Sequence, residues 1–321
     1  MAIASSADNI RYNGTGIAYA ATVGSANPGA DLGELEGFSF NQSVTKSQLK
    51  STRNAARGVI LEAVDETTAT LKFGLKEQTE ENLKVALMAA SVSSNNQVAG
   101  NVYQTTKAWV ADEYIDLGKL NVYSTKVTGT ITGTLAIGDT VTGDVSNKTG
   151  KIAFVGTNFI ELVEVSGPMD TDTKLTKDVG NYITVSGLAV QDDVVIVSSD
   201  GATRRVQGTD YTIEPKAGYV RKLTGGSLAD ADKVSFDYSA VTRKVLYGLS
   251  SNTVLRKVTF VTDADDYGPR KRYTFHKVNL SPEGDMTLLG DGTEVLNVTG
   301  TVVRDTTQQS GQEYYKVEVM E

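Results

Sequence analysis

Cysteine is absent from the 321 residues, and histidine and tryptophan each occur once, as His276 and Trp109. The lack of cysteine excludes disulfide bonds, thiolate metal sites and cysteine nucleophiles. A single histidine excludes nearly all histidine-based metal sites and acid–base triads. The sequence also lacks the nucleotide-binding loops and the nucleophile-elbow motif. We therefore expect no catalytic residue, no metal site and no cofactor, and predict that the chain is not an enzyme.

Long apolar runs are absent as well. No stretch approaches the roughly 20 apolar residues that a membrane-spanning helix needs. The first residues, Met1 to Asp8, lack both a basic region and an apolar core, so no secretory signal is expected. These absences predict synthesis in a cytoplasm and no membrane partner.

Positive charge is in deficit. Lys and Arg number 31 against 39 Asp and Glu, which gives a formal net charge of −8. Proteins that grip nucleic acid neutralise phosphates with clustered Lys and Arg. An acidic surface repels a polyanion within a Debye length of roughly 8 Å at physiological salt. We expect no specific binding of DNA.

What the sequence does contain is short runs rich in Val, Ile, Thr, Phe and Tyr. Clusters of Gly, Asn, Asp and Ser separate these runs at intervals of 8–12 residues, which is typical of sandwiches and barrels. The fold class predicted is all-β, a β-sandwich or barrel of antiparallel strands with one flanking α-helix. Predicted strands include residues 32–40, 59–64, 69–75, 129–135, 151–155, 159–165, 182–185, 193–197, 233–238, 256–261 and 295–303.

One segment has the pattern of a helix, about residues 79–91. Thr79 is a suitable N-cap, and Glu80 and Glu81 follow in the first turn, where the helix dipole favours anions. Leu83, Ala86, Leu87 and Ala90 then form one apolar face. So short a helix is not stable alone, so we expect it to pack on a sheet.

The texture of the sequence changes between residues 124 and 181. Two similar phrases, Ile137 to Gly143 and Met169 to Thr176, flank the predicted strands at 151–155 and 159–165. We interpret residues 124–181 as an inserted small β module, because surface loops tolerate insertions at little entropic cost. Residues 1–123 and 182–321 then form the main β-sandwich domain.

A basic segment lies between the predicted strands at 32–40 and 59–64. Lys46, Lys50, Arg53 and Arg57 fall within twelve residues of an otherwise acidic chain. The segment is interpreted either as a long solvated hairpin loop, Thr45 to Gly58, or as an arm that docks on the acidic face of a neighbouring subunit. A nucleic-acid role is the weakest of the three interpretations.

Other residues have simpler interpretations. His276 lies in an alternating run and is predicted to be a strand residue. Three acidic pairs have the composition of a glycosidase site, although solvated strand faces explain them more simply. They are Glu34 and Glu36, Glu62 and Asp65, and Glu161 and Glu164. Trp109 and the 14 tyrosines suggest a sugar-binding platform or, more simply, core and interface positions.

Three blocks of the sequence resemble the major tail tube proteins of long-tailed bacteriophages. The first begins with Leu32-Gly-Glu-Leu-Glu-Gly-Phe-Ser-Phe40 and ends with Thr79-Glu-Glu-Asn-Leu-Lys-Val-Ala-Leu87. The second joins Tyr114 to Leu120 with Val206 to Ile213 and Ala217 to Val220. The third comprises Val258 to Val261, Gly268-Pro-Arg270 and Phe275 to Asp285. The stretch 124–181 departs from the family.

The resemblance implies a tail-tube-like fold with an inserted β module, in a virion tail assembled in the host cytoplasm. Six subunits would close into a ring, and stacked rings would form a tube through which DNA passes. Tape measure, tail terminator and distal tail proteins would be partners, and the loop with Lys46, Lys50, Arg53 and Arg57 would stack one ring on the next. Glu34 and Glu36 are candidates for the lumen, because an acidic channel lets DNA slide.

A second interpretation of function remains open. The chain would then be a phage surface decoration protein or adhesin, and its inserted module would bind a host glycan. Loss of binding on deletion of residues 124–181, with assembly intact, would distinguish this role.

Overall fold

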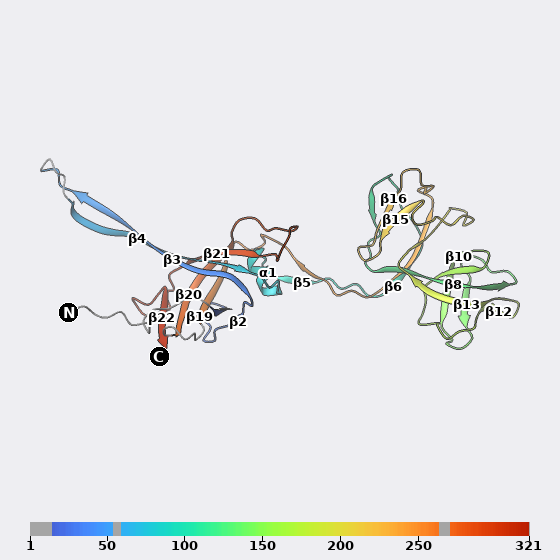
Figure 1. Cartoon of the computed structure of the whole chain (residues 1–321), viewed down its shortest axis with the longest axis horizontal. Coiled ribbons are helices and arrows are strands. Elements are labelled where there is room, and N and C mark those ends of the chain that lie inside the picture. Colours follow the sequence, from blue (N-terminus) through green and yellow to red (C-terminus); the bar gives the residue numbers. More distant parts are fainter. Residues whose placement is uncertain (1–14, 54–58, 263–269, 321) are drawn as a thin grey trace. The chain divides into compact units, whose positions relative to one another are not determined.

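The computed structural model describes residues 15–53, 59–262 and 270–320. About 53% of the chain lies in strands, and the described residues contain one α-helix. The prediction of an all-β, antiparallel fold with one helix is confirmed. Figure 1 shows the strands along the chain.

The chain divides into two compact units. Unit 1 comprises residues 1–93 and 245–321, and unit 2 comprises residues 94–244. The segment predicted as an insertion, 124–181, lies within unit 2. Unit 2 also takes in strands on both sides of this segment.

Unit 1 is built on an eight-stranded antiparallel sheet. Its strand order is β2-β1-β19-β20-β21-β4-β3, and β22 pairs with the N-terminal half of β20. The strands are β1 (Gly16–Ala21), β2 (Ala30–Asp31), β3 (Leu35–Lys50), β4 (Val59–Leu75), β19 (Val254–Thr262), β20 (Arg270–Pro282), β21 (Leu296–Val302) and β22 (Tyr315–Met320).

One face of this sheet packs into the core of unit 1. Alternation along β4 and β21 turns Leu71, Phe73, Leu75 and Val298 inward, where they are buried with Phe275 of β20. At the start of β3, Gly37 has a φ of 67° and forms a bulge between Glu36 and Phe38. This extra residue allows Leu35 and Phe38 to face the same side of the sheet.

The helix α1 (Glu80–Ala86) covers part of the core face. Thr79 is its N-cap, and the Thr79 side chain accepts a hydrogen bond from the Asn82 backbone N–H at 3.2 Å. The predicted start of the helix is confirmed, whereas its predicted end, near residue 91, is wrong. Leu87 is the C-cap, and Met88 adopts a left-handed conformation with a φ of 50°.

The first predicted strands also differ from the structure. Residues 45–50, predicted as part of a loop, continue β3, and the two predicted runs at 59–64 and 69–75 are one strand, β4. The pairing of β3 with β4 runs from Leu35 and Leu75 out to Lys50 and Val59. Each strand satisfies the backbone of the other, so the polar residues between the runs need no turn.

Unit 2 contains a closed barrel of six antiparallel strands. The order is β11-β10-β9-β12-β13-β8, and β11 pairs back to β8, which removes both edges. Val127, Ile152, Ile160, Leu162 and Ile183 fill the interior and are fully buried. The strands are β8 (Val122–Thr132), β9 (Thr140–Gly143), β10 (Thr149–Val155), β11 (Phe159–Val163), β12 (Lys174–Asp178) and β13 (Asn181–Gln191).

The remaining strands of unit 2 enclose a second core around Trp109, Tyr211 and Phe236. β17 extends the barrel sheet from β8, and β14 and β6 pair with β17. A three-stranded sheet has the order β15-β16-β7. A short ribbon pairs β5 with β18, and the boundary between units 1 and 2 falls within both of these strands. The bounds are β5 (Val92–Ser94), β6 (Gly100–Thr106), β7 (Tyr114–Asp116), β14 (Val195–Val197), β15 (Tyr211–Glu214), β16 (Tyr219–Lys222), β17 (Lys233–Tyr238) and β18 (Lys244–Leu246).

Candidate functional site

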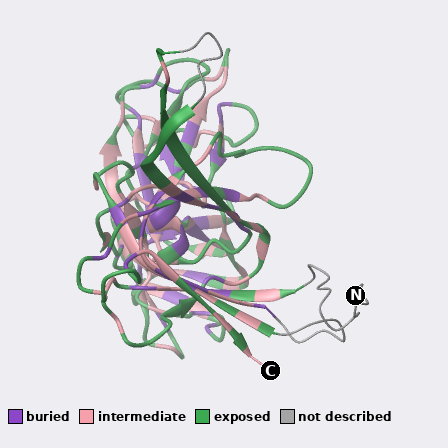
Figure 2. Ribbon diagram, turned by 90° about the vertical axis from the view of Figure 1, so that its left-hand side faces the viewer, coloured by how far each residue is buried: buried purple, intermediate pink, exposed green. Residues whose placement is uncertain are grey.

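The outer half of the β3–β4 hairpin extends away from the core of unit 1. We call this part the arm and define it as residues 41–50 of β3 and 59–67 of β4. Every residue of the arm is exposed. Figure 1 shows the two strands running out beyond the rest of their sheet, and Figure 2 shows them in green, the colour of exposed residues. An isolated two-stranded hairpin is marginally stable in water, because it lacks a third strand or a helix to pack against. The arm is such a hairpin.

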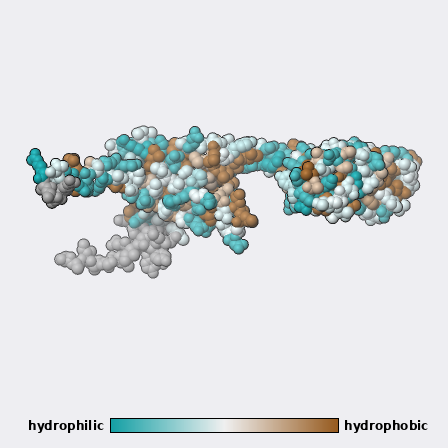
Figure 3. Space-filling view, turned by 90° about the horizontal axis from the view of Figure 1, so that it is seen from above, coloured by the Kyte–Doolittle hydropathy of each residue, from teal (hydrophilic) through white to brown (hydrophobic). Residues whose placement is uncertain are grey.

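Six aliphatic side chains of the arm have half or more of their surface exposed. Leu49 and Leu61 are direct cross-strand partners and share one face, while Val64 pairs with Lys46 on the other. Figure 3 shows brown patches that interrupt the hydrophilic surface of the arm. Single exposed aliphatics are ordinary, but six within one hairpin that has no apolar backing indicate an interaction surface. The six are Val44 (50%), Leu49 (60%), Val59 (51%), Ile60 (65%), Leu61 (59%) and Val64 (59%).

The predicted cations of the arm are not equivalent. Lys46 Nζ lies 2.6 Å from Glu62 Oε1, and hydrogen bonds from Lys46 and then Gln48 lower the pKa of Glu62. Lys50 and Arg53, near the tip, have no ion-pair partner within the part of the chain that the structure describes. Arg57 lies outside the described residues. The basic character of the arm is therefore concentrated at its end.

Charge on β4 balances charge on β3. Glu62, Asp65 and Glu66 lie on the strand opposite Lys46 and Lys50. Ser47 Oγ also donates a hydrogen bond to Asp65 Oδ1 at 2.7 Å. The arm as described is thus a polar ribbon with nearly balanced charge and aliphatic residues on both faces, which differs from the purely basic segment of the sequence.

Strand edges are the second feature of unit 1. β3 pairs with β4 alone, so its other edge, from Leu35 to Lys50, has no strand partner among residues 15–53, 59–262 and 270–320. β22 pairs with β20 alone and exposes Val317 (43%) and Val319 (57%). An unpaired edge is a template for a strand of another chain.

A loop of unit 1 also exposes apolar residues. Between β20 and β21, Leu288 and Leu289 are 78% and 95% exposed, and Met286 is 39% exposed. The arm, the strand edges and this loop give unit 1 several surfaces with the composition of a protein contact.

The two acidic residues predicted for a lumen, Glu34 and Glu36, are exposed at the start of β3. Glu36 Oε2 lies 3.9 Å from Lys76 Nζ, and the backbone N–H of Glu34 donates to Glu77 Oε1 at 3.2 Å. Glu34 lines a cavity of about 570 Å³ together with Asp31 and Glu77, over an apolar floor of Phe38 and Phe260. Glu36 is on the outer face of the sheet with Ser39, Lys72 and Asn297. Their position in a lumen stays a prediction.

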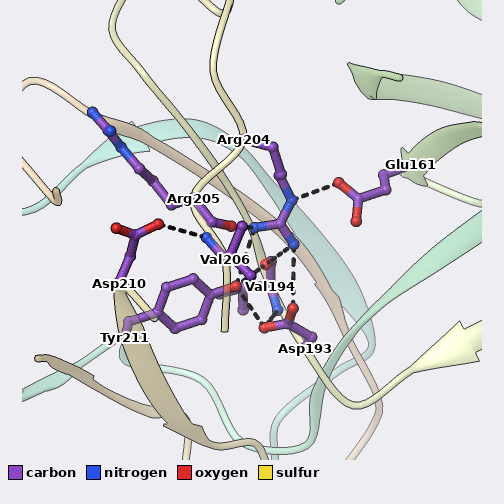
Figure 4. Close-up of polar contacts among 8 residues, drawn as sticks. All are labelled: Glu161, Asp193, Val194, Arg204, Arg205, Val206, Asp210 and Tyr211. Carbon is purple, nitrogen blue, oxygen red and sulfur yellow. Dashed lines mark hydrogen bonds and ion pairs between the residues drawn. The ribbon is translucent and has the colours of Figure 1, made fainter. Parts of the chain in front are cut away.

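The densest buried polar cluster lies in unit 2, around Arg204 (Figure 4). Arg204 Nε donates to Glu161 Oε2 at 2.6 Å, and Nη2 donates to Asp193 Oδ2 at 3.2 Å. Its Nη atoms also donate to the carbonyls of Val194 and Arg205 and to the Tyr211 hydroxyl. The guanidinium therefore ties barrel strand β11 to the segment that precedes β14 and to β15.

The cluster around Arg204 is internally satisfied. The Tyr211 hydroxyl donates toward Asp193 Oδ1 at 2.8 Å and lies 3.0 Å from the Val194 carbonyl. Burial raises the pKa values of Asp193 and Tyr211. Buried, paired and hydrogen-bonded groups of this kind fix a fold, and perturbed pKa values are common in structural ion pairs. We interpret the cluster as structural.

Sequence reasoning missed this cluster. The expectation of a solvated strand face for Glu161 is wrong, because Glu161 is 6% exposed and pairs with Arg204. Nothing in a sequence marks two residues 43 positions apart as partners. The one signal was the pair Arg204–Arg205 in a β-rich region, in which Arg205 also forms a bidentate pair with Asp232.

Across the described ranges, no group of three or more histidine or acidic side chains is placed to hold a metal ion. The one helix of the described residues, α1, is neither long nor apolar enough to cross a bilayer. His276 is a residue of strand β20, as predicted, and burial lowers its pKa.

Comparison with known proteins gives a family but no activity. A family model described as "Protein of unknown function UCP028589" matches residues 11–166 and 161–317. No curated protein matches the chain.

Proposed function

Since the chain belongs to the family of unknown function UCP028589, whose description assigns no activity, we propose from its sequence and structure that it is a self-assembling structural protein, the tail tube protein of a long-tailed phage. Six copies would form a ring, and rings would stack into a tube through which DNA passes. The protein would have no catalytic role.

The observation that carries the proposal is the arm of unit 1. Its six exposed aliphatic residues lie on a ribbon that nothing in the described chain covers. Burial of apolar surface contributes about 25 cal/mol per Å². A second copy that covers the arm would therefore stabilise both the contact and the ribbon itself. The resemblance assigns the contact between rings to this segment.

Open strand edges support the same proposal. Pairing β3 or β22 with a strand of a neighbour would satisfy backbone groups that a monomer leaves to water. The formal charge supports the role of a passage for DNA, because six copies would carry about −48 in all. The lumen assignment of Glu34 and Glu36 remains part of the proposal.

Negative-stain electron microscopy and sedimentation velocity of the full chain test the proposal. We expect rings or hollow tubes that lengthen with protein concentration. The double variant Leu49→Ser, Leu61→Ser removes one apolar face of the arm and should leave folded subunits without tubes. Val179→Ser is the matched control, because Val179 is 98% exposed in unit 2 and lies outside the arm.

Charge at the tip of the arm is tested in the same assay. Lys50→Glu with Arg53→Glu should shorten the tubes, whereas Lys46→Gln should have a weaker effect, because Lys46 already pairs within the arm. A wild-type protein that stays monomeric at every concentration would contradict the proposal. Tubes of unchanged length from the Leu49, Leu61 variant would contradict the role of the arm.

A further inference from the structure

Unit 2 has an exposed face that the assembly proposal does not use. In the three-stranded sheet β15-β16-β7, Ile115, Tyr211, Ile213 and Val220 face the core of unit 2. The alternate residues therefore lie on the opposite face. We call this the tyrosine face and define it as Tyr114, Asp116, Thr212, Glu214, Tyr219 and Arg221.

Strand register arranges the six residues in two rows of three. Arg221 stands between Thr212 and Tyr114 in one row, and Tyr219 stands between Glu214 and Asp116 in the other. Tyr114 and Tyr219 are diagonal neighbours on adjacent strands. Diagonal pairs of this kind lie about 7–8 Å apart, which places two aromatic rings within reach of one small ligand.

The two tyrosines are exposed, although their large rings have apolar area to bury. Tyr114 is 53% and Tyr219 is 43% exposed, while Tyr211 on the core side of the same sheet is fully buried. The Arg221 guanidinium carbon lies 5.6 Å from the centre of the Tyr114 ring. Within the part of the chain described, Arg221 forms an ion pair with neither Asp116 nor Glu214. Its charge is therefore held against an aromatic ring and not neutralised.

This combination of groups suits a ligand with an apolar face and a rim of hydroxyl groups. The electron-rich face of an aromatic ring attracts the polarised C–H groups of a pyranose ring. Carboxylates accept hydrogen bonds from neighbouring hydroxyls at two oxygens, and a guanidinium donates in a planar fork. Glu214 is placed for the first role, as is the Oδ2 atom of Asp116, whose Oδ1 already accepts a hydrogen bond from the Gly118 backbone N–H at 2.6 Å. Arg221 is placed for the second through its Nη atoms, because its Nε is buried.

Charge and size narrow the choice of ligand. The two carboxylates are matched by Arg221 and by Lys107, whose Nζ donates to the Asp116 carbonyl at 3.2 Å, so the face has no excess of positive charge to select phosphates. A stable protein interface takes roughly 20–30 residues a side, far more than these six. One or two sugar rings match two tyrosines on adjacent strands.

We propose that the tyrosine face binds neutral pyranosyl units of an oligosaccharide or polysaccharide. The two tyrosine rings hold the apolar face of the sugar, and Asp116, Glu214 and Arg221 hold its hydroxyls. The site lies outside residues 124–181, so it is distinct from the glycan role considered for the inserted module. It is independent of the proposed assembly.

Isothermal titration of the full chain with cellohexaose, maltohexaose and chitohexaose tests the proposal. We expect saturable binding of at least one of the three. Tyr114→Ala and Tyr219→Ala should each weaken the dissociation constant roughly three- to tenfold, the size of one aromatic contact. Tyr219→Phe should bind as the wild type does, because it keeps the ring.

Tyr247→Ala is the matched control, since Tyr247 is 67% exposed and lies outside the tyrosine face. It should leave binding unchanged. Absence of saturable binding to all three sugars at millimolar concentration, with the protein folded, overturns the proposal. Equal loss of affinity in Tyr247→Ala and the tyrosine-face variants overturns it too. Tyrosine-face variants that change the sedimenting species and not sugar affinity would identify a protein contact and also overturn it.

Discussion

Unit 1 and unit 2 treat the edges of their sheets in opposite ways. The six strands β8 to β13 of unit 2 close on themselves, and the barrel has no open edge. The sheet of unit 1 ends in β3 and leaves the arm uncovered. A barrel satisfies its own backbone, whereas an open sheet with a bare ribbon depends on water or on a partner.

The two units also differ in where they place charged and apolar side chains. Unit 2 buries charged groups, and it satisfies Arg204 with five acceptors. The arm of unit 1 exposes six aliphatic side chains. The Arg204 cluster is thus satisfied within unit 2, while the arm of unit 1 leaves apolar surface exposed.

Removing the centre of the Arg204 cluster should have the largest effect on stability. Arg204→Ala leaves Glu161 and Asp193 buried without a cation, so we expect a loss of about 3–5 kcal/mol in the unfolding free energy of unit 2. Urea denaturation, followed by the fluorescence of Trp109 in unit 2, measures it. Lys177→Ala is the control, because its pair with Asp139, also in unit 2, is partly exposed and should contribute little. Equal midpoints for the two variants would contradict the contrast.

A buried carboxyl of unit 2 should give a smaller effect that depends on pH. Burial raises the pKa of Asp237 to about 6, and the nearby charge of Glu164 raises it further. Hydrogen bonds from the backbone N–H groups of Glu164 and Val165 lower the pKa but do not offset the burial. The unfolded chain ionises near 3.8, so between about pH 4 and pH 6 the folded state binds the extra proton. Stability from this group is therefore present at low pH and falls as the pH rises through this window.

Comparison with Asp237→Asn isolates this carboxyl. The difference in unfolding free energy between wild type and variant should change by about 1–3 kcal/mol between pH 4 and pH 7, in the direction of a wild type that loses stability with rising pH. Denaturation at a series of pH values measures the difference. Parallel profiles for the two proteins would show that burial does not perturb Asp237.

The smallest effect concerns the helix of unit 1. Thr79→Ala removes the acceptor for the Asn82 backbone N–H, and we expect a loss of about 1 kcal/mol in the unfolding free energy of unit 1. Thr79→Ser should restore it, because serine caps equally well. Hydrogen exchange at the amides of α1 locates the change in unit 1. An unchanged exchange rate in Thr79→Ala would show that packing alone fixes the helix start.

Local patterns in the sequence predicted much of the fold. Alternation of apolar residues located the strands at β10, β11, β17, β19 and β21, and Thr79 with the two glutamates located the helix start. Such signals lie within a few residues of each other, so they can be recognised without knowing which distant segment the strand or helix packs against.

The errors arose where a distant segment decides the local structure. The helix ends early because the carbonyls of Leu87 and Met88 accept hydrogen bonds from the backbone N–H groups of Leu249 and Ser251. β3 runs on beyond its apolar part because β4 pairs with it to Lys50. A polar, exposed strand and a long polar loop have the same composition, so the sequence alone does not distinguish them.

The candidate site was predicted in part. The arm was found from its cations, but its aliphatic faces appear only once register places Leu49 opposite Leu61. The tyrosine face forms only when β7 pairs with β16, and these two strands are about a hundred residues apart in the sequence. Composition suggested tyrosine contacts without locating them.

The continuity of β3 and β4 also has a mechanical consequence. The same two strands form the arm and two strands of the sheet, and β4 pairs on its inner side with β21. Their hydrogen bonds lie perpendicular to the strand axis. A pull on the tip, directed along the arm, therefore loads these bonds side by side in shear and not one after another. Tension applied to the arm is therefore transmitted directly to the sheet that forms the core of unit 1.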